Sequence, residues 1–295
     1  MRFETRLIKS NRTRTIASRH PVMFLKPITA AYTVTFGDRA ENETGMQMIG
    51  HSVAKGISVA TLSELKQKLQ NVGVDSFIKD LAVDQPVPVP AACVLVIPDG
   101  VNKLLGSGAA SQMLKELNSM PKDKTSLMYG RVVNKHARYN NCMADYFQSP
   151  DIKNGKGTVV KFEDYPVTNR LRKKLCEMLN QPTLVGELNH YFDSNTCGIG
   201  WHGDSERKIV VGVRLGRGAD EFPLKFQWYL RGAAVGEVQR ISLNASDIYI
   251  SSEKAVGTDW KKSSILTLRH AAGKDTCKYS ADPAKSKKRG RDVAQ

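Results

Sequence analysis

His202 and Asp204, two residues apart, are the residues of this sequence whose types and spacing point most directly to chemistry. In a strand, side chains two positions apart project to the same side of the sheet. An imidazole nitrogen and a carboxylate oxygen would then converge on one point, and both bind divalent metal ions. With a second histidine they would form the 2-His-1-carboxylate triad of non-haem Fe(II) oxygenases, which leaves coordination positions open.

Further residues on both sides of this pair add to the pattern. Asn189 and Tyr191 precede it as N-x-Y, the pair itself lies in GWHGDSE (200–206), and LTLR (266–269) follows it. A basic stretch, RVVNKHARYN (131–140), lies upstream. Together these motifs resemble the AlkB-like family of 2-oxoglutarate- and Fe(II)-dependent dioxygenases. The resemblance covers roughly residues 125–280, about half of the chain.

The resemblance implies a fold and a set of roles. The core would be a double-stranded β-helix, or jelly roll. His202 and Asp204 would bind Fe(II), and Arg269 would bind the distal carboxylate of 2-oxoglutarate, because a guanidinium grips a carboxylate as a fork. Asn189 and Tyr191 would add hydrogen bonds to this cosubstrate. His202, Asp204 and Arg269 are therefore the predicted catalytic set.

The sequence leaves the third metal ligand open. No histidine lies between Asp204 and His270, and none follows His270. His270 adjoins Arg269, and adjacent residues of a regular strand face opposite ways, so a bulge or a strand end at 271–273 would have to re-aim it. Asp259 is the second candidate. The third possibility is that no residue completes the site, so that the fold persists without catalysis.

Charge and aromatic residues indicate the partner. The formal net charge of +15 favours a polyanion, nucleic acid first. Within 131–140, the cations Arg131, Lys135 and Arg138 interleave with Tyr139, a combination that suits a phosphodiester and an unstacked base. These four residues are the predicted nucleic-acid contacts. Because a base in a duplex is out of reach, the substrate would be single-stranded or flipped.

The predicted reaction is hydroxylation of an N-alkyl group on a nucleic-acid base, in which dioxygen and 2-oxoglutarate are consumed and formaldehyde and succinate are released. The alternative is a catalytically inactive AlkB-like fold that serves as a basic nucleic-acid-binding or virion structural protein. An oxygenase that acts on protein or lipid is the third hypothesis. The sequence does not identify the alkyl group or distinguish DNA from RNA.

The chain has 295 residues and an α+β pattern. Helical periodicity predicts helices over 58–81, 104–117 and 169–179, and short alternating segments predict strands elsewhere. We predict an N-terminal α+β module over 1–120, a double-stranded β-helix domain over 121–282 and a basic disordered tail over 283–295.

The remaining sequence features concern compartment and assembly. Five scattered cysteines without a C-x-x-C pair predict free thiols in a reducing compartment. There is no run of 18 apolar residues and no apolar signal region, so no membrane partner is expected. The motif KSKKRGR (285–291) is compatible with nuclear import, so we expect an intracellular monomer in nucleus or cytoplasm, or a virion-associated one.

Overall fold

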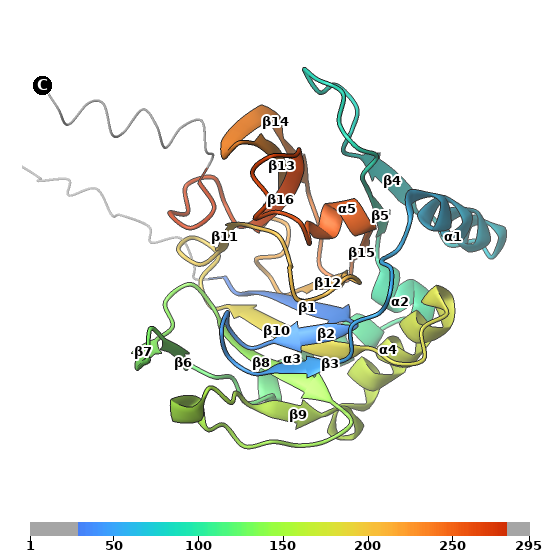
Figure 1. The fold of residues 1–295 in the computed structure, drawn as a ribbon. Helices are drawn as coiled ribbons and strands as arrows, with labels where there is room; N and C mark the ends of the chain where they lie inside the picture. The colour runs from blue at the N-terminus through green and yellow to red at the C-terminus, as the bar shows by residue number, and fades with distance from the viewer. Residues whose placement is uncertain (1–28, 282–295) are drawn as a thin grey trace, which may run out of the picture.

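The computed structural model describes residues 29–281, so the basic N-terminal segment and the tail with KSKKRGR lie outside the described residues. Within this range the fold is mixed α+β, and strands dominate it. A sheet of eight strands lies opposite a sheet of four, with short hairpins at the periphery (Figure 1). No helix between residues 29 and 281 has the length and apolar character needed to cross a bilayer.

The large sheet is antiparallel except for the parallel pair β8 and β9. Its strands follow the order β4-β5-β15-β12-β1-β10-β8-β9. Their bounds are β1 (Ala31–Gly37), β4 (Phe77–Asp80), β5 (Cys93–Ile97), β8 (Tyr139–Ala144), β9 (Val159–Lys161), β10 (Val185–Tyr191), β12 (Val211–Leu215) and β15 (Ile248–Ser251).

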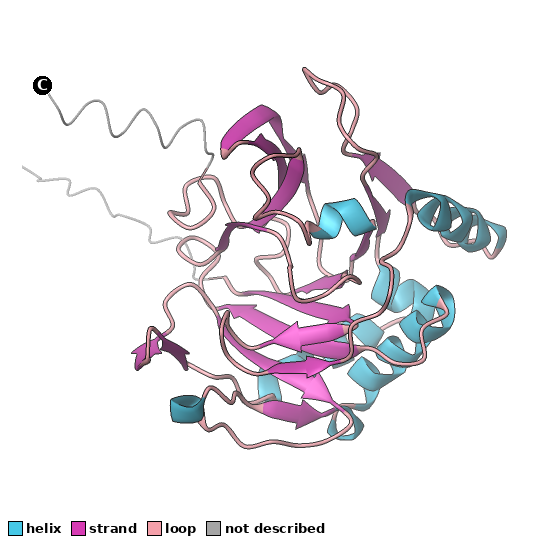
Figure 2. Ribbon diagram, in the orientation of Figure 1, coloured by secondary structure: helices cyan, strands magenta, loops and turns pink. Residues whose placement is uncertain are grey.

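Helices cover one face of the large sheet. The alternation along β1 explains why: Tyr32, Val34 and Phe36 belong to the larger apolar core, whereas Thr33 and Thr35 line a cavity on the opposite face. Figure 2 shows helices gathered at the right of the view. The helices that pack into this core are α1 (Val59–Asn71), α2 (Gly100–Leu105), α3 (Ala109–Ser119) and α4 (Pro166–Leu179).

The small sheet has the order β11-β16-β13-β14. Its strands are β11 (Ile199–His202), β13 (Leu224–Leu230), β14 (Ala233–Ile241) and β16 (Thr267–Ala272). β16 pairs with β13 in an unbroken register. Side chains therefore alternate strictly along β16, and Leu268, on the same side as His270, packs with Phe226 and Trp228 in the second apolar core.

Short elements complete the described residues. They are the hairpin strands β2 (Arg39–Glu41), β3 (Met48–Gly50), β6 (Thr125–Met128) and β7 (Arg131–Asn134), the 3-10 turns η1 (Ile152–Asn154) and η2 (Phe162–Asp164), and α5 (Glu253–Val256). The β6–β7 hairpin stands away from the body of the molecule in Figure 1. Its turn residues Tyr129 and Gly130 have φ values of 52° and 73°, as a two-residue hairpin turn requires.

The predicted division at residue 120 needs correction, because it runs through one hydrogen-bonded sheet. β1 lies between β10 and β12, and β5 pairs with β15. Of the strands before residue 120, β1, β4 and β5 therefore belong to the large sheet, and only the hairpin strands β2 and β3 pair with each other alone. Local patterns identify strands but carry no information on which distant strand completes each ladder.

Two predicted helices also differ from the observed ones. The helix predicted over 58–81 ends at Asn71, and the chain continues through Gly73 at a φ of 74° into the edge strand β4. The helix predicted over 104–117 is divided into α2 and α3, because Gly106 and Gly108 both adopt positive φ. The helix predicted over 169–179 is confirmed and begins slightly earlier, at Pro166.

Candidate metal centre and anion site

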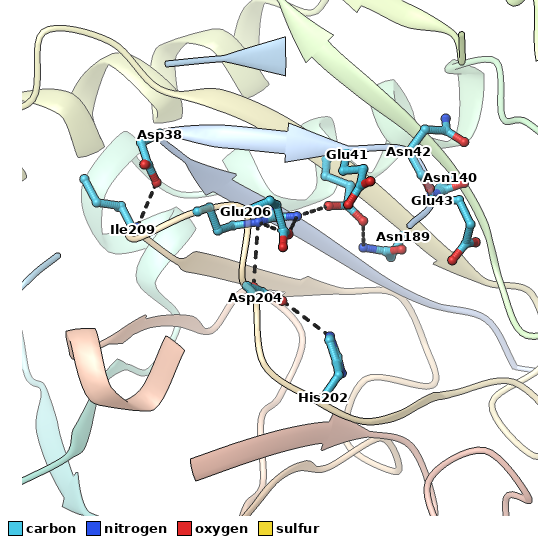
Figure 3. Close-up of polar contacts among 12 residues, drawn as sticks. Asp38, Glu41, Asn42, Glu43, Asn140, Asn189, His202, Asp204, Glu206 and Ile209 are labelled. Carbon is cyan, nitrogen blue, oxygen red and sulfur yellow. Dashed lines mark hydrogen bonds and ion pairs between the residues drawn. The ribbon is translucent and has the colours of Figure 1, made fainter. Parts of the chain in front are cut away.

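His202, Asp204 and His270 meet at one point between the two sheets. β11 and β16 pair with His202 opposite His270, across a ladder whose register shifts between Ile199 and His202. Asp204 lies two residues beyond the end of β11, not on the strand with His202 as the sequence predicted. The Asp204 Oδ1 atom lies 3.4 Å from His202 Nε2 and 3.5 Å from His270 Nε2. The three potential ligand atoms lie within 4.8 Å of one another. Figure 3 shows His202 and Asp204 pointing toward each other. Two imidazoles and one carboxylate are the donor set that non-haem Fe(II) uses.

The regular alternation of β16 decides which of two adjacent residues faces this cluster. His270 faces the cluster, and the ladder between β16 and β13 has no bulge, so the side chain of His270 does not have to be turned by an irregularity of that ladder. Arg269 projects from the other side of the strand, where its guanidinium lies over the rings of Tyr229, at 4.0 Å, and Trp260, at 5.2 Å. The assignment of Arg269 to the cosubstrate carboxylate is thus corrected, because His270 and Arg269 cannot both face the cavity. The other candidate ligand, Asp259, instead forms an ion pair of 2.7 Å with Lys254.

Arg214 on β12 supplies the buried cation that Arg269 does not. Its side chain is fully buried, and none of its three guanidinium nitrogens has a hydrogen-bond partner. Its guanidinium carbon lies 4.9 Å from the ring of Phe222. Burial lowers the pKa of Arg214, whereas the Tyr249 and Tyr191 phenols act in the opposite direction. An unpaired buried charge is costly, so this geometry favours binding of an anionic group.

A single cavity joins the metal cluster to Arg214. Its volume is about 70 Å³, and the metal cluster and Arg214 both line it. Thr33, the cross-strand neighbour of Arg214, also lines it, and the Thr33 hydroxyl is buried without a partner. Unpaired donors thus lie in the same cavity as the metal cluster. Its wall includes Asn189, Tyr191, Ile199, Val210, Leu224, Phe226 and Tyr249.

Arg207 holds the carboxylate of the cluster in place. This buried side chain forms ion pairs with Glu187 at 2.6 Å, Glu206 at 2.8 Å and Asp204 Oδ2 at 3.7 Å. Burial alone would raise the pKa of Asp204, but the charges of Arg207 and then His270, with hydrogen bonds from both histidines, hold it well below its usual range. Asp204 is therefore a carboxylate, with Oδ2 toward Arg207 and Oδ1 toward the histidines.

The two histidines differ in their surroundings. His202 Nδ1 lies 2.7 Å from the carbonyl oxygen of Gly200 and donates to it, which leaves Nε2 available as a ligand. Burial lowers the pKa of His202, but the hydrogen bond and charge of Asp204 outweigh it, so the pKa is raised. The pKa of His270 is lowered by burial and then by the charge of His202.

Asn189 and Tyr191, which the resemblance expects to hydrogen-bond the cosubstrate, both line the cavity, but the Asn189 amide already has partners. Its Oδ1 accepts a hydrogen bond of 2.6 Å from Arg138 Nε, and its Nδ2 donates to Glu187 Oε1 at 2.9 Å. Tyr191 is buried with its ring 4.3 Å from that of Phe222. Asn189 therefore connects Arg138 to the network that supports Asp204.

The four predicted nucleic-acid contacts have different surroundings. Arg131 is exposed on the β6–β7 hairpin. Arg138 forms an ion pair of 3.6 Å with Glu43 at the opening of the site, and Tyr139 stacks on Phe192 at 4.4 Å. Lys135 is only 8% exposed and donates to buried amide oxygens. Its assignment as a surface contact is corrected, because its ammonium points into the protein.

A wider opening leads from the surface to the metal cluster, and we call it the mouth. Trp201 and Trp260 line it together with acidic and basic side chains. Those charged residues are Arg39, Glu41, Glu43, Arg138, Glu187, Asp204, Glu206 and Lys261. A substrate would therefore approach His202 between aromatic rings and charges of both signs.

No protein-family model matches the chain. An uncharacterized protein of Acanthamoeba polyphaga mimivirus is 43% identical to it over 254 residues, which span 84% of this chain and 97% of the viral protein. The chain belongs to the same family as this viral protein. Because that relative is uncharacterized, the function has to be argued from the geometry of the site.

Sequence reasoning missed Arg214 and Arg207. Arg214 interrupts the otherwise apolar segment IVVGVRLG (209–216), and a lone charge inside a buried strand is the signal that could have identified it. Arg207 lies three residues after Asp204, and nothing in that spacing distinguishes it from a surface arginine.

Proposed function

We propose that the protein is a 2-oxoglutarate- and Fe(II)-dependent dioxygenase with a double-stranded β-helix core. The observation that carries the proposal is the joint presence, in one cavity, of a 2-His-1-carboxylate cluster and a fully buried, unpaired guanidinium. A metal site alone suits many reactions. The unpaired Arg214 adds a site for a small carboxylate beside the metal, as a 2-oxoglutarate-dependent enzyme requires.

The residues present fit both groups. His202, Asp204 and His270 would hold Fe(II), which when bound supplies the activation of dioxygen. Arg214 would bind the distal carboxylate of 2-oxoglutarate, with the Thr33 hydroxyl as a second donor. Arg207 keeps Asp204 ionised and oriented. The apolar wall formed by Phe226, Leu224 and Ile199 would restrict water around the reacting groups.

We propose that the substrate is an N-alkyl group on a nucleic-acid base. The net charge of +15 supports a polyanion, and Trp201 and Trp260 at the mouth suit a base that is flipped or single-stranded. In the overall reaction one oxygen atom of dioxygen enters succinate as 2-oxoglutarate loses carbon dioxide. The other enters a C–H bond of the alkyl group, and the resulting hydroxymethyl group leaves its nitrogen as formaldehyde.

An anaerobic titration with Fe(II) and 2-oxoglutarate tests the proposal through the metal-to-ligand charge-transfer band. We expect the band in the wild type and its loss in Asp204→Ala and His270→Ala. The control Asp259→Asn should keep the band, because Asp259 contacts Lys254 rather than the cluster. A wild type without the band would reject the oxygenase and favour a noncatalytic, basic nucleic-acid-binding protein. With the band established, formaldehyde release from alkylated oligonucleotides tests the substrate separately.

A further inference from the structure

A buried polar cluster, distinct from the metal site, joins three segments that are far apart in the sequence. Asn42 follows β2, Asp123 precedes β6 and Lys135 follows β7. Their exposed fractions are 1%, 8% and 8%. Figure 3 shows Asn42 beside Asn140, which also belongs to the cluster. The proposed oxygenase chemistry uses none of these side chains.

Lys135 is buried among neutral partners. Its Nζ donates to Asn42 Oδ1 at 2.7 Å and to Asn140 Oδ1, and it forms no ion pair with a carboxylate among residues 29–281. Burial lowers the pKa of Lys135 to about 8. At pH 7 roughly one molecule in ten then carries the neutral amine, which is the nucleophilic form.

Asp123 is fixed against the amide nitrogen of Asn42. Asn42 Nδ2 donates to Asp123 Oδ2 at 2.7 Å. Thr158 holds the same carboxylate, with its backbone N–H at 2.8 Å from Oδ2 and its hydroxyl at 2.6 Å from Oδ1. Gly157 leaves room for this contact, because a Cβ at that position would lie 2.4 Å from Asn42 Nδ2.

The contacts of Asn42 and Asn140 indicate which of the two side-chain amides would react with the Lys135 amine. Asn140 Nδ2 donates to the backbone oxygen of Asn42, which is a neutral acceptor. The amide nitrogen of Asn42 instead donates to the Asp123 carboxyl group, which can carry a proton once it is protonated. Asn42 therefore has an amine next to its side-chain carbonyl group and a carboxyl group at its nitrogen, and transamidation needs an amine and a proton carrier beside the same amide.

We propose that Lys135 and Asn42 form an intramolecular isopeptide bond, with Asp123 as the proton carrier. The neutral Lys135 amine attacks Cγ of Asn42, so that the Nζ–Cγ bond forms and the Cγ–Nδ2 bond breaks. Nζ gives its proton to Oδ1 of Asn42, which it already contacts, and Oδ1 returns it to solvent as the carbonyl re-forms. Asp123, protonated from solvent, gives a proton to Nδ2, which leaves as ammonia. One amine and one amide become one amide and ammonia, without an oxidant, a reductant or another reactant.

The bond would fasten one wall of the mouth. Asn42 and Lys135 are 93 residues apart, and each lies next to a mouth segment: Glu43 and Arg138 come from the same two parts of the chain and pair at 3.6 Å. A covalent link would hold these segments together even when the ion pair is screened by salt. It would also resist reducing agents, unlike a disulfide, and the five cysteines are all free.

Intact-mass spectrometry of the denatured, reduced full-length chain tests the proposal. We expect the wild type to be lighter than its sequence mass by one ammonia, and Lys135→Arg and Asp123→Asn to show the full mass. Lys124→Arg, a change at an exposed lysine nearby, should keep the loss. A wild type that shows the full mass even after prolonged incubation at pH 9, where the Lys135 amine is mostly neutral, overturns the proposal.

A tryptic digest identifies the site. Acylated Lys135 resists trypsin, so residues 40–55 and 132–138 should appear as one branched peptide. Cyclisation of another asparagine, such as Asn154 before Gly155, also releases ammonia. That cyclisation would give no branched peptide, and the loss of one ammonia would also be seen in Lys135→Arg. Either result would refute the cross-link.

Discussion

Replacing Arg214 by methionine should make the ligand-free protein more stable. The substitution removes a fully buried guanidinium whose three nitrogens have no partner and leaves an apolar side chain beside Phe222. Replacing buried charge by an apolar side chain of similar volume stabilises proteins by about 1–4 kcal/mol. We expect about 2 kcal/mol here, which for a chain of this length raises the melting temperature by roughly 4 °C.

The same substitution should remove the response to 2-oxoglutarate. A ligand present at a hundred times its dissociation constant stabilises the folded state by about 2.7 kcal/mol. The wild type should therefore melt roughly 5 °C higher when 2-oxoglutarate is added to the Mn(II)-loaded protein. Arg214→Met should show little of this shift, because the distal carboxylate has lost its fork of donors.

Scanning calorimetry with and without 2-oxoglutarate, at constant Mn(II), measures both effects. Arg269→Met is the matched control: it removes an arginine of the same size that stacks on Tyr229 outside the cavity, so the ligand shift should remain. The reasoning fails if Arg214→Met destabilises the ligand-free protein and keeps the ligand shift. That result would make Arg214 a structural residue and leave the cosubstrate without a cation.

Two further predictions concern the surroundings of the site. Arg207→Gln should weaken Mn(II) binding about 10–100-fold in calorimetric titration, because it removes the support of Asp204; unchanged affinity would show that Arg207 supports only the fold. Burial lowers the pKa of His190 to about 4, so the folded state disfavours its protonation, and stability should fall as the pH drops below about 6.5. At pH 5 the loss is about 2 kcal/mol. Urea unfolding at pH 7 and pH 5 should show a smaller difference in His190→Phe, and equal differences would contradict the assignment.

The sequence was informative where the chemistry is local. The sequence predicted that His202 and Asp204 face the same point, and they do, although Asp204 lies beyond the end of β11 and its backbone N–H donates to the carbonyl oxygen of Val256. Asn189 and Tyr191 lie on a strand whose alternation is equally readable, and the apolar stripe of α4 predicted that helix. The helix predicted over 58–81 was too long, since apolar periodicity does not mark where Gly73 turns the chain.

Local sequence patterns could not predict which distant strands pair with each other. β1 completes its ladders with β10 and β12, more than 140 residues away, and this pairing joins the segments that the sequence had assigned to two domains. Lys135 shows the same limit for a single side chain. Its basic, tyrosine-containing segment suggests a surface, whereas the fold turns its ammonium toward Asn42.

By itself, then, the sequence indicated the mixed α+β character and the His202–Asp204 pair, and it left the third ligand open among His270, Asp259 and none. The tertiary structure decided that His270 completes the cluster and that Arg214, rather than Arg269, faces the cavity. The physical reason is that β16 is a regular strand, so only one of two adjacent residues can point inward. Which one does so depends on the pairing of β16 with β11 and β13, and that pairing exists only in the folded chain.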